Sequence, residues 1–347
     1  MRPSRKSILS LVAAVLLLYL SLRKLEPHEI WVQVARANPA WLLAAVALNL
    51  AHYLGRAFRW RRMLEHFKQG IGLIPLLRST FVGFLVTWVF PGRLGEFVRP
   101  LLLGRREGIP VSGAVSTVVL ERVLDAASVL GLFAVALLWL PFGPLAAIPP
   151  ARLAPLVRAG GLLGAAAILA LLLLLGTFLA RDRLLRLLPG RAGAAGGQPT
   201  LLRWAREFTE GFQVLTAPRR LLAVLSHSLG IWVVIGLNSW CALRAFRLDL
   251  PVMAVFLFLP LPVLGIAAPT PGGLGSFEFF CRWGLENLFG APAPQALAAS
   301  VGLHAVSLFP VAVFGPVAAW REGVSLRGLL RESREALAGR GGEGVAG

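Results

Sequence analysis

The amino-acid sequence predicts an all-α polytopic integral membrane protein that has no large soluble domain. Of its 347 residues, 56% are hydrophobic and only 15% are charged, whereas an ordinary globular domain is about one-quarter charged. Apolar runs recur from residue 8 to residue 319, with no long polar stretch between them. Such a chain needs lipid as its solvent, so only loops and tails remain for the aqueous phase.

The first apolar run, residues 8–22, follows a basic N-terminus and resembles a secretory signal peptide. An Ala-x-Ala pattern occurs at residues 35–37, but it lies well beyond the apolar core, where cleavage is not expected. We therefore expect a retained signal anchor.

Six apolar stretches are long enough to be membrane spans, because a helix needs about 20 mostly apolar residues to cross the hydrocarbon core. Two further apolar regions are interrupted by the glycine- and proline-rich strings PGRLGE and PTPGGLGSFE. The predicted spans are residues 8–22, 40–58, 112–140, 155–180, 221–243 and 296–320, and the interrupted regions are residues 71–104 and 251–290.

The distribution of cations sets the expected orientation. The segments assigned to the cytoplasmic side hold 22 of the 35 Lys and Arg residues, and cytoplasmic loops carry such an excess. The net charge of +18 then fits anionic lipid headgroups better than nucleic acid. We expect both termini on the cytoplasmic side of a bacterial or archaeal cell (inner) membrane. These segments are the N-terminus, residues 59–68, residues 105–106, residues 181–220 and the chain after residue 320.

This orientation predicts two re-entrant helical hairpins. If Lys68 and Arg105 both lie in the cytoplasm, residues 71–104 must enter and leave the membrane on the same side. By the same logic, residues 251–290 enter and leave from the outer side. The bends would leave backbone groups unpaired in lipid, so they must be buried in protein or line a wet cavity.

The two halves of the chain are predicted to form an inverted repeat, about residues 40–140 and 221–320. Their interruptions align as PGRLGE and PGGLGS, and interrupted helices at matching positions favour a transport site near the midplane. We expect one transmembrane domain over residues 1–322, with a cytoplasmic linker at about 181–220 and a partly disordered cytoplasmic tail at 323–347. The predicted hairpin breakers are Pro91, Gly92, Gly95, Pro271, Gly272, Gly273 and Gly275.

Polar residues recur inside the first repeat, although each ionisable group within a span costs about 2.5–3.5 kcal/mol on insertion scales. Asn49, His52, Arg56 and Arg59 fall on one helical face. Arg56 and Arg59 could extend to the cytoplasmic surface instead of facing the interior. Asn49 and His52 lie deeper and favour an interior role.

More charges follow the first interruption. A helix is predicted to restart near Leu94, which places Glu96 in its first turn, with Arg99 three residues later. Arg93 and the exposed N–H groups of the bend would form a cradle for an anion.

The next span contains ERVLD, in which Glu121 and Asp125 share a face and Arg122 can reach Asp125. Two interpretations stay open for these charges: ion pairs that hold the hairpin against the span, and direct contact with a substrate.

The second repeat carries fewer charges. Glu278 and Arg282 are spaced i, i+4, the favourable order for an ion pair on a helix. His227 shares a face with Asn238, and His304 lies on a polar face of the last span. An intramembrane histidine often serves only an interhelical hydrogen bond. The cysteines, Cys241 and Cys281, have no metal-ligand spacing and are interpreted as packing residues.

Four motifs, taken in order, resemble those of a known family. They are RAFRWRRML at 56–64, PGRLGEFVR at 91–99, ERVLD at 121–125 and PTPGGLGSFE at 269–278. The chain resembles the transmembrane region of lysylphosphatidylglycerol synthetase, the multiple peptide resistance factor, and its stand-alone flippase-like relatives, over residues 8–322.

The resemblance implies a flippase domain that translocates aminoacyl-phosphatidylglycerol or another phosphate-bearing lipid. The chain ends soon after its last predicted span, without an aminoacyl-transferase domain, so lipid synthesis is not expected. The residues that the resemblance places in the translocation site are Arg93, Glu96, Arg99, Glu121, Arg122, Asp125 and Glu278.

We therefore expect a lipid flippase or lipid transporter rather than an enzyme, with no catalytic residue, no metal and no cofactor. Arg56 and Arg282 join the candidate site on the residue pattern alone. The expected partners are membrane lipids with an anionic headgroup and not nucleic acid, and a homo-oligomer or a membrane-enzyme partner is compatible with the sequence.

Two alternatives are an intramembrane enzyme that acts on a lipid or lipid-carrier phosphate and a noncatalytic subunit that recruits a lipid-modifying enzyme. No GxxxxGK[ST] loop is present, so the energy would come from a gradient, or the protein would be a passive scramblase.

Overall fold

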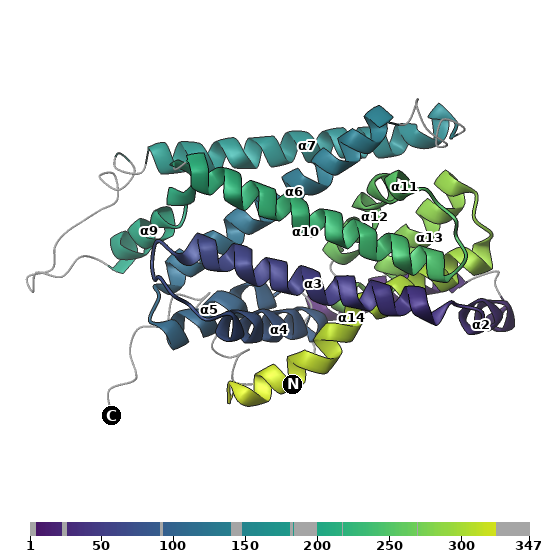
Figure 1. Ribbon diagram of the computed structural model, residues 1–347, viewed down its shortest axis with the longest axis horizontal. Helices are drawn as coiled ribbons and strands as arrows, with labels where there is room; N and C mark the ends of the chain where they lie inside the picture. The colour runs from purple at the N-terminus through teal and green to yellow at the C-terminus, as the bar shows by residue number, and fades with distance from the viewer. Residues whose placement is uncertain are drawn as a thin grey trace, which may run out of the picture.

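The computed structural model describes residues 5–22, 26–90, 93–139, 148–180, 183, 200–216, 218–268 and 270–323. Within these residues all regular structure is helical (Figure 1), which confirms the all-α class. The helices are α1 (Arg5–Leu22), α2 (Pro27–Ala35), α3 (Pro39–Leu64), α4 (Leu73–Val89), α5 (Gly95–Glu107), α6 (Val111–Trp139), α7 (Pro150–Leu179), α9 (Thr200–Glu210), α10 (Pro218–Ala245), α11 (Val252–Phe258), α12 (Pro260–Ala267), α13 (Ser276–Phe289) and α14 (Ala293–Arg321), with 3-10 turns η3 (Gln213–Thr216) and η4 (Pro271–Gly273).

Each of the six predicted spans coincides with one long helix, namely α1, α3, α6, α7, α10 or α14. By length and composition, α7, α10 and α14 can cross a membrane, and α2 with α3, bent by 83°, would make a fourth span if they are counted together. The chain is thus a membrane protein, and the number of six spans stays a prediction.

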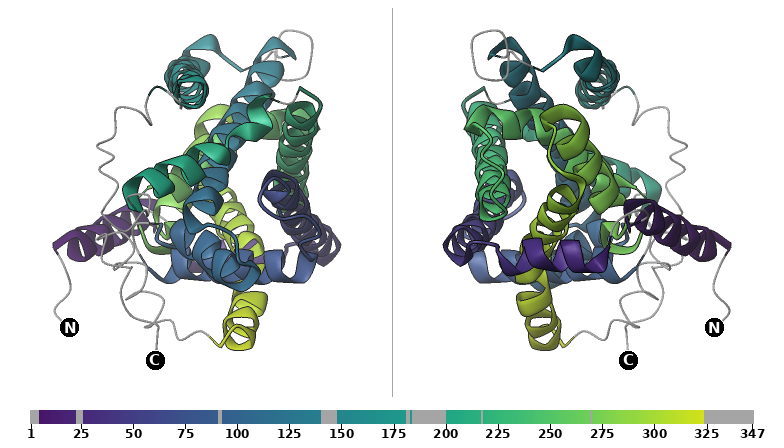
Figure 2. Two further views of the ribbon diagram at one scale, coloured as in Figure 1. Left: turned by 90° about the vertical axis from the view of Figure 1, so that its left-hand side faces the viewer. Right: turned by 90° about the vertical axis from the view of Figure 1, so that its right-hand side faces the viewer.

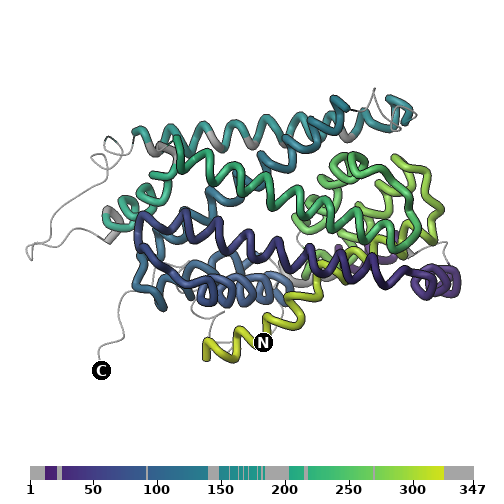
Figure 3. Tube along the Cα trace, in the orientation of Figure 1, coloured from purple at the N-terminus to yellow at the C-terminus, as the bar shows by residue number. Residues whose placement is uncertain are grey.

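Helices α3 and α10 pack extensively against each other and lie side by side along the long axis of the molecule (Figures 1 and 3). Helix α3 begins with Pro39 after an N-cap, because the side chain of Asn38 accepts a hydrogen bond from the Ala40 N–H at 2.9 Å. The Asn38 N–H donates to the Ala245 carbonyl at 2.8 Å. The start of α3 is therefore fixed to the end of α10, and the two helices run antiparallel.

Helices α4 and α5 form the first hairpin. Lys68, before α4, bonds the carboxylate of Glu107 at the end of α5 at 2.7 Å and its carbonyl at 3.0 Å. The hairpin therefore enters and leaves at the same end of the molecule, as the distribution of cations predicts. Gly95 is the first residue of α5, whereas the other two predicted breakers, Pro91 and Gly92, lie outside the described residues.

The two arms of this hairpin touch backbone to backbone at Gly83 and Gly95. A Cβ atom on Gly95 would lie 1.7 Å from the Gly83 carbonyl oxygen, which no side-chain movement can relieve. We expect Gly95→Ala to lower the free energy of unfolding by about 1–3 kcal/mol or more, as overpacked cores do. Thermal unfolding in detergent checks this, with Gly131→Ala as the control because a Cβ there meets nothing within 4 Å. An unchanged melting temperature for Gly95→Ala would contradict the tight crossing.

Helices α11, α12 and α13 form the second hairpin. Its two ends are also joined, because the Gln295 amide near the start of α14 donates to the Phe246 carbonyl at 2.8 Å. The turn between α12 and α13 needs glycine, since φ is +60° at Gly272, +77° at Gly273 and +79° at Gly275. Pro271 starts this turn as the first residue of η4.

The two hairpins approach from opposite ends and meet at their tips (Figure 1). The Arg93 guanidinium lies 3.5 Å from the Ile266 carbonyl oxygen, and a Cβ on Gly272 would lie 3.4 Å from the Trp88 carbonyl oxygen. The predicted inverted repeat requires this arrangement, and the repeat and its domain boundaries stay predictions.

Of the predicted cytoplasmic linker at 181–220, the described part is mainly α9, which packs on α6 through a hydrogen bond from Ser112 to Glu207. Figure 2 shows α1 and α7 at the outside of the bundle. Residues 184–199 and the predicted tail after residue 323 lie outside the described residues.

Candidate functional site

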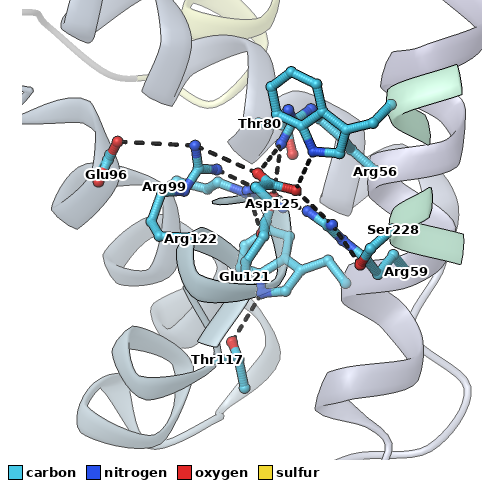
Figure 4. Close-up of polar contacts among 12 residues, drawn as sticks. Arg56, Arg59, Thr80, Glu96, Arg99, Thr117, Glu121, Arg122, Asp125 and Ser228 are labelled. Carbon is cyan, nitrogen blue, oxygen red and sulfur yellow. Dashed lines mark hydrogen bonds and ion pairs between the residues drawn. The ribbon is translucent and has the colours of Figure 1, made fainter. Parts of the chain in front are cut away.

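A cluster of charged side chains lies inside the bundle, where α3, α5 and α6 converge (Figure 4). Arg56 and Arg59 come from α3, Arg99 from α5, and Glu121 and Asp125 from α6, and none is more than 5% exposed. The helical spacing explains the convergence, because residues three, four or seven apart share one face. The prediction that Arg59 could extend to the surface is wrong, since that side chain is fully buried.

Asp125 is held by three donors at hydrogen-bond distance. Its carboxylate accepts from Arg59 at 2.6 Å, from Arg56 at 3.0 Å and from the Trp232 indole at 3.0 Å. Arg59 also donates to the Ser228 hydroxyl at 2.8 Å. Trp232 and Ser228 belong to α10, so this carboxylate joins the two predicted halves of the chain.

Glu121 is paired as completely as Asp125 is. Its carboxylate contacts Arg59 at 2.8 Å, Arg56 at 3.0 Å and Arg99 at 2.9 Å. The Arg99 guanidinium lies over the Trp60 ring at 3.8 Å from its centroid, which adds a cation–π contact. For Glu121 and Asp125, these contacts favour the ion-pairing interpretation.

A second layer of charges is half-exposed and reaches the tip of the first hairpin. Arg122 lies 3.7 Å from Asp125, as its spacing predicts, and 4.0 Å from Glu96, which in turn lies 3.5 Å from Arg93. Glu96 is in the first turn of α5, as predicted.

The linked charges do not balance. Among the described residues, five arginines are linked to three carboxylates, which leaves an excess of two positive charges. Several buried guanidinium nitrogens also have no hydrogen-bond partner, among them Nε and Nη2 of Arg99 and Nε of Arg56 and Arg122. Unmatched charge and unmatched donors together favour an anion as the missing partner. The eight residues are Arg56, Arg59, Arg93, Arg99, Arg122, Glu96, Glu121 and Asp125.

A central cavity of about 180 Å³ lies beside this cluster and under both hairpin tips. A cavity of this volume holds several water molecules, so a small headgroup can enter it. Glu96 is the one carboxylate that lines it among the described residues. The polar lining comprises Asn49, His52, Arg56, Thr87, Arg93, Glu96, Arg99, Arg122, Asn238, Ser239 and Ser307, and the aromatic lining Tyr53, Phe84, Trp88, Trp232 and Phe277.

Glu278 belongs to a different contact, at the tip of the second hairpin. Its carboxylate accepts from the Gly275 N–H at 2.8 Å and lies 2.5 Å from His304 Nδ1. His304 Nε2 lies 3.1 Å from the Gly272 carbonyl oxygen. A carbonyl can only accept, so Nε2 carries a hydrogen and a second proton lies between His304 and Glu278. This pair connects α13, α14 and the η4 turn.

Truncating His304 should therefore destabilise this hairpin. We expect His304→Ala to lower the free energy of unfolding by about 1–3 kcal/mol, because Glu278 loses a buried partner. Glu278→Gln should cost less, since its amide can donate to Nδ1 while its oxygen accepts from Gly275. Thermal unfolding of both variants in one detergent checks the order, and a larger loss for Glu278→Gln would contradict the proton between the two side chains.

The predicted ion pair between Glu278 and Arg282 is wrong. Arg282 does not pair with Glu278 but contacts Glu286 at 2.5 Å and donates to the Ser21 carbonyl of α1. It does not line the central cavity, and Glu278 contacts His304 on α14 instead. His227 bonds only the Ala223 carbonyl of its own helix, at 2.6 Å, among the contacts described for it.

Several side chains of the site were not singled out by the sequence. Trp232, Ser228 and Trp60 have no charge that makes them conspicuous in an apolar helix. A signal exists only for Trp232, which lies seven residues before Ser239 and so shares a helical face with it. Within the described residues, no group of three or more His, Cys, Asp or Glu side chains is placed to hold a metal ion.

Comparisons with known proteins agree with the sequence-based resemblance. The family model described as "Lysylphosphatidylglycerol synthase TM region" matches residues 7–315. The chain is also similar to "Glycosyltransferase AglD" of Haloferax volcanii, with 26% identity across 96% of this chain. It spans 58% of the length of that protein.

Proposed function

Because this chain belongs to the family of the lysylphosphatidylglycerol synthase transmembrane region, we propose that it is a flippase for a lipid with an anionic, phosphate-bearing headgroup. The observation that carries the proposal is the excess of two positive charges beside a partly open cavity between two hairpin tips. A phosphodiester brings one negative charge and several acceptor oxygens, which suit the arginine side chains that line the cavity.

The arrangement of the hairpins supports alternating access. Each hairpin enters from one end and reaches the cavity with its tip, so movement of either tip would open the cavity toward one side only. The headgroup would be held between the tips while its chains remain in the bilayer. We place the end that carries residues 64–73 on the cytoplasmic side of the cell membrane, from the excess of cations there.

In this mechanism the charges have two roles. Arg93, Arg99 and Arg122 line the cavity and would bind the phosphate. Glu121 and Asp125 do not line it, and they would hold the arginines in place. Such preorganised donors bind an anion without having to rearrange.

An intramembrane enzyme is the second candidate, favoured by the name of the similar protein, a glycosyltransferase. Acid–base chemistry would need carboxylates that reach the substrate. Glu121 and Asp125 are occupied by arginines, which leaves Glu96 at the cavity within the described residues. Translocation therefore fits these side chains better than group transfer.

Translocation in proteoliposomes tests the proposal. The vesicles would contain phosphatidylglycerol with a fluorophore on one acyl chain, and a membrane-impermeant quencher would report the outer leaflet. We expect the protein to make nearly all of the label accessible and Arg93→Gln to slow this several-fold.

The matched control is Arg244→Gln, because Arg244 pairs with Asp249 outside the central cavity. Equal rates with and without protein would overturn the proposal. Turnover of the lipid phosphate, seen by mass spectrometry of the extracted lipid, would favour the enzyme.

A further inference from the structure

A second hollow, of about 480 Å³, lies between α3, α4 and α14. Most of its lining is apolar, with Leu54 and Leu77 on two of the helices and Phe314 and Val317 on the third. Leu54 is 46% exposed and Val317 53% exposed. In a membrane protein such side chains face the hydrocarbon region, so this groove opens to the bilayer.

Two cations stand at one end of the groove. Arg78 is in the second turn of α4 and Arg321 is the last residue of α14. Arg78 lies 3.6 Å from Glu322, but Arg106 contacts the same carboxylate at 2.5 Å. Arg78 and Arg106 thus share one carboxylate, and Arg321 lines the same groove, so cations outnumber anions among these four side chains. Glu107, which lies 3.9 Å from Arg106, is itself paired with Lys68. Cations at helix ends lie at headgroup depth and attract anionic lipids.

The groove and the central cavity share one residue, Tyr53. Its side chain is only 4% exposed, and its ring packs against Phe81 at 4.9 Å and Phe84 at 5.6 Å between centroids. Tyr53 therefore lies in the wall between a groove with exposed apolar side chains and a cavity that several arginines line.

We propose that this groove binds a hydrocarbon chain of the transported anionic lipid, with Arg78 and Arg321 holding its headgroup before it passes Tyr53 into the central cavity. The apolar lining suits the hydrocarbon chain of the lipid, and the excess of cations suits its negative headgroup. The shared residue, Tyr53, indicates the route between the two sites. The inference rests on the proposed function and adds the entry path to it.

Helix α14 has a built-in means of widening the groove. Pro310 and Pro316 lie inside it, and each lacks the N–H that would bond the preceding turn. The helix is therefore weakest in the segment that carries Phe314, which lines the groove. Bending there would move one wall of the groove and separate Phe314 from Phe81 of α4, whose ring centroids now lie 5.4 Å apart.

Photocrosslinking tests the groove without relying on transport. The full chain would be reconstituted with phosphatidylglycerol or phosphatidylcholine that carries the same diazirine-labelled acyl chain, and labelled peptides would be mapped by mass spectrometry. We expect phosphatidylglycerol to label the peptides with Leu77 and Phe314 several-fold more than phosphatidylcholine does. The double variant Arg78→Gln/Arg321→Gln should remove that difference.

A pair of tryptophan variants on α14 tests whether the groove is on the transport path. Val317 lines the groove, whereas Val313, 43% exposed on the same helix, does not. We expect Val317→Trp to slow translocation of phosphatidylglycerol at least tenfold and Val313→Trp to leave it unchanged, with equal melting temperatures.

The outcomes separate this inference from the proposed function. Equal labelling by both lipids, or labelling that avoids the groove, overturns the inference even if the protein translocates lipid. Equal translocation by Val317→Trp and the wild type overturns the entry path. Selective labelling of the groove without any translocation would support the lipid-binding site and contradict the proposed flippase function.

Discussion

Replacing Asp125 by alanine should lower the free energy of unfolding by about 3–5 kcal/mol, the cost of removing one partner from a buried ion pair. The carboxylate accepts from Arg56, Arg59 and Trp232, and it lies 3.7 Å from Arg122. Without it, the excess of positive charge in the cluster rises from two to three. Thermal unfolding in detergent, together with the yield of monodisperse protein, measures the loss.

Asp249→Ala is the matched control for this change. Asp249 also pairs with an arginine, Arg244, at 2.8 Å, but its side chain is 77% exposed, and surface pairs contribute about 0–1 kcal/mol. A small effect at Asp249 and a large one at Asp125 is the expected result. Equal effects at both positions would show that the buried cluster does not hold the fold together.

Arg122→Gln should have the opposite combination of effects, with the fold kept and transport lost. Arg122 lines the cavity and its side chain is 31% exposed. Its removal lowers the excess of positive charge to one, so the remaining arginines repel each other less. We expect an unchanged or higher melting temperature and at least a tenfold slower translocation of phosphatidylglycerol.

A measurement of lipid binding shows whether the loss of transport comes from a loss of phosphatidylglycerol binding. Phosphatidylglycerol should raise the melting temperature of the wild type, because a ligand that binds only the folded state stabilises it, and it should raise that of Arg122→Gln much less. Phosphatidylcholine serves as the reference lipid. A variant that melts lower than the wild type and still binds phosphatidylglycerol would contradict the assignment of Arg122 to the anion site.

Much of the fold could be predicted because the positions of charges and the lengths of helices can be read from short stretches of the sequence. Lys68 and Arg105 implied that residues 71–104 enter and leave on one side of the membrane, and the bond between Lys68 and Glu107 places both ends of this segment at one end of the molecule. The glycine-rich breakers indicated where each hairpin bends. Positive φ angles at Gly272 and Gly275 show why glycine stands there.

The partners of each charge could not be predicted, because they come from helices far apart in sequence. Local spacing paired Glu278 with Arg282, yet the carboxylate turns to His304 on another helix. Arg59 resembled a surface residue because it lies near the basic end of α3. Its burial depends on Asp125 and Ser228, from two other helices. Local spacing could therefore find the charged positions but not their network.

The central claim is that an excess of buried positive charge selects and carries an anionic lipid. The most direct measurement is the ratio of translocation rates for phosphatidylglycerol and phosphatidylcholine, with the same labelled chain, in vesicles that contain the wild-type protein. We expect phosphatidylglycerol to move at least tenfold faster, with rates that depend on protein. Equal rates for the two lipids, or no protein-dependent movement of phosphatidylglycerol, would contradict the claim.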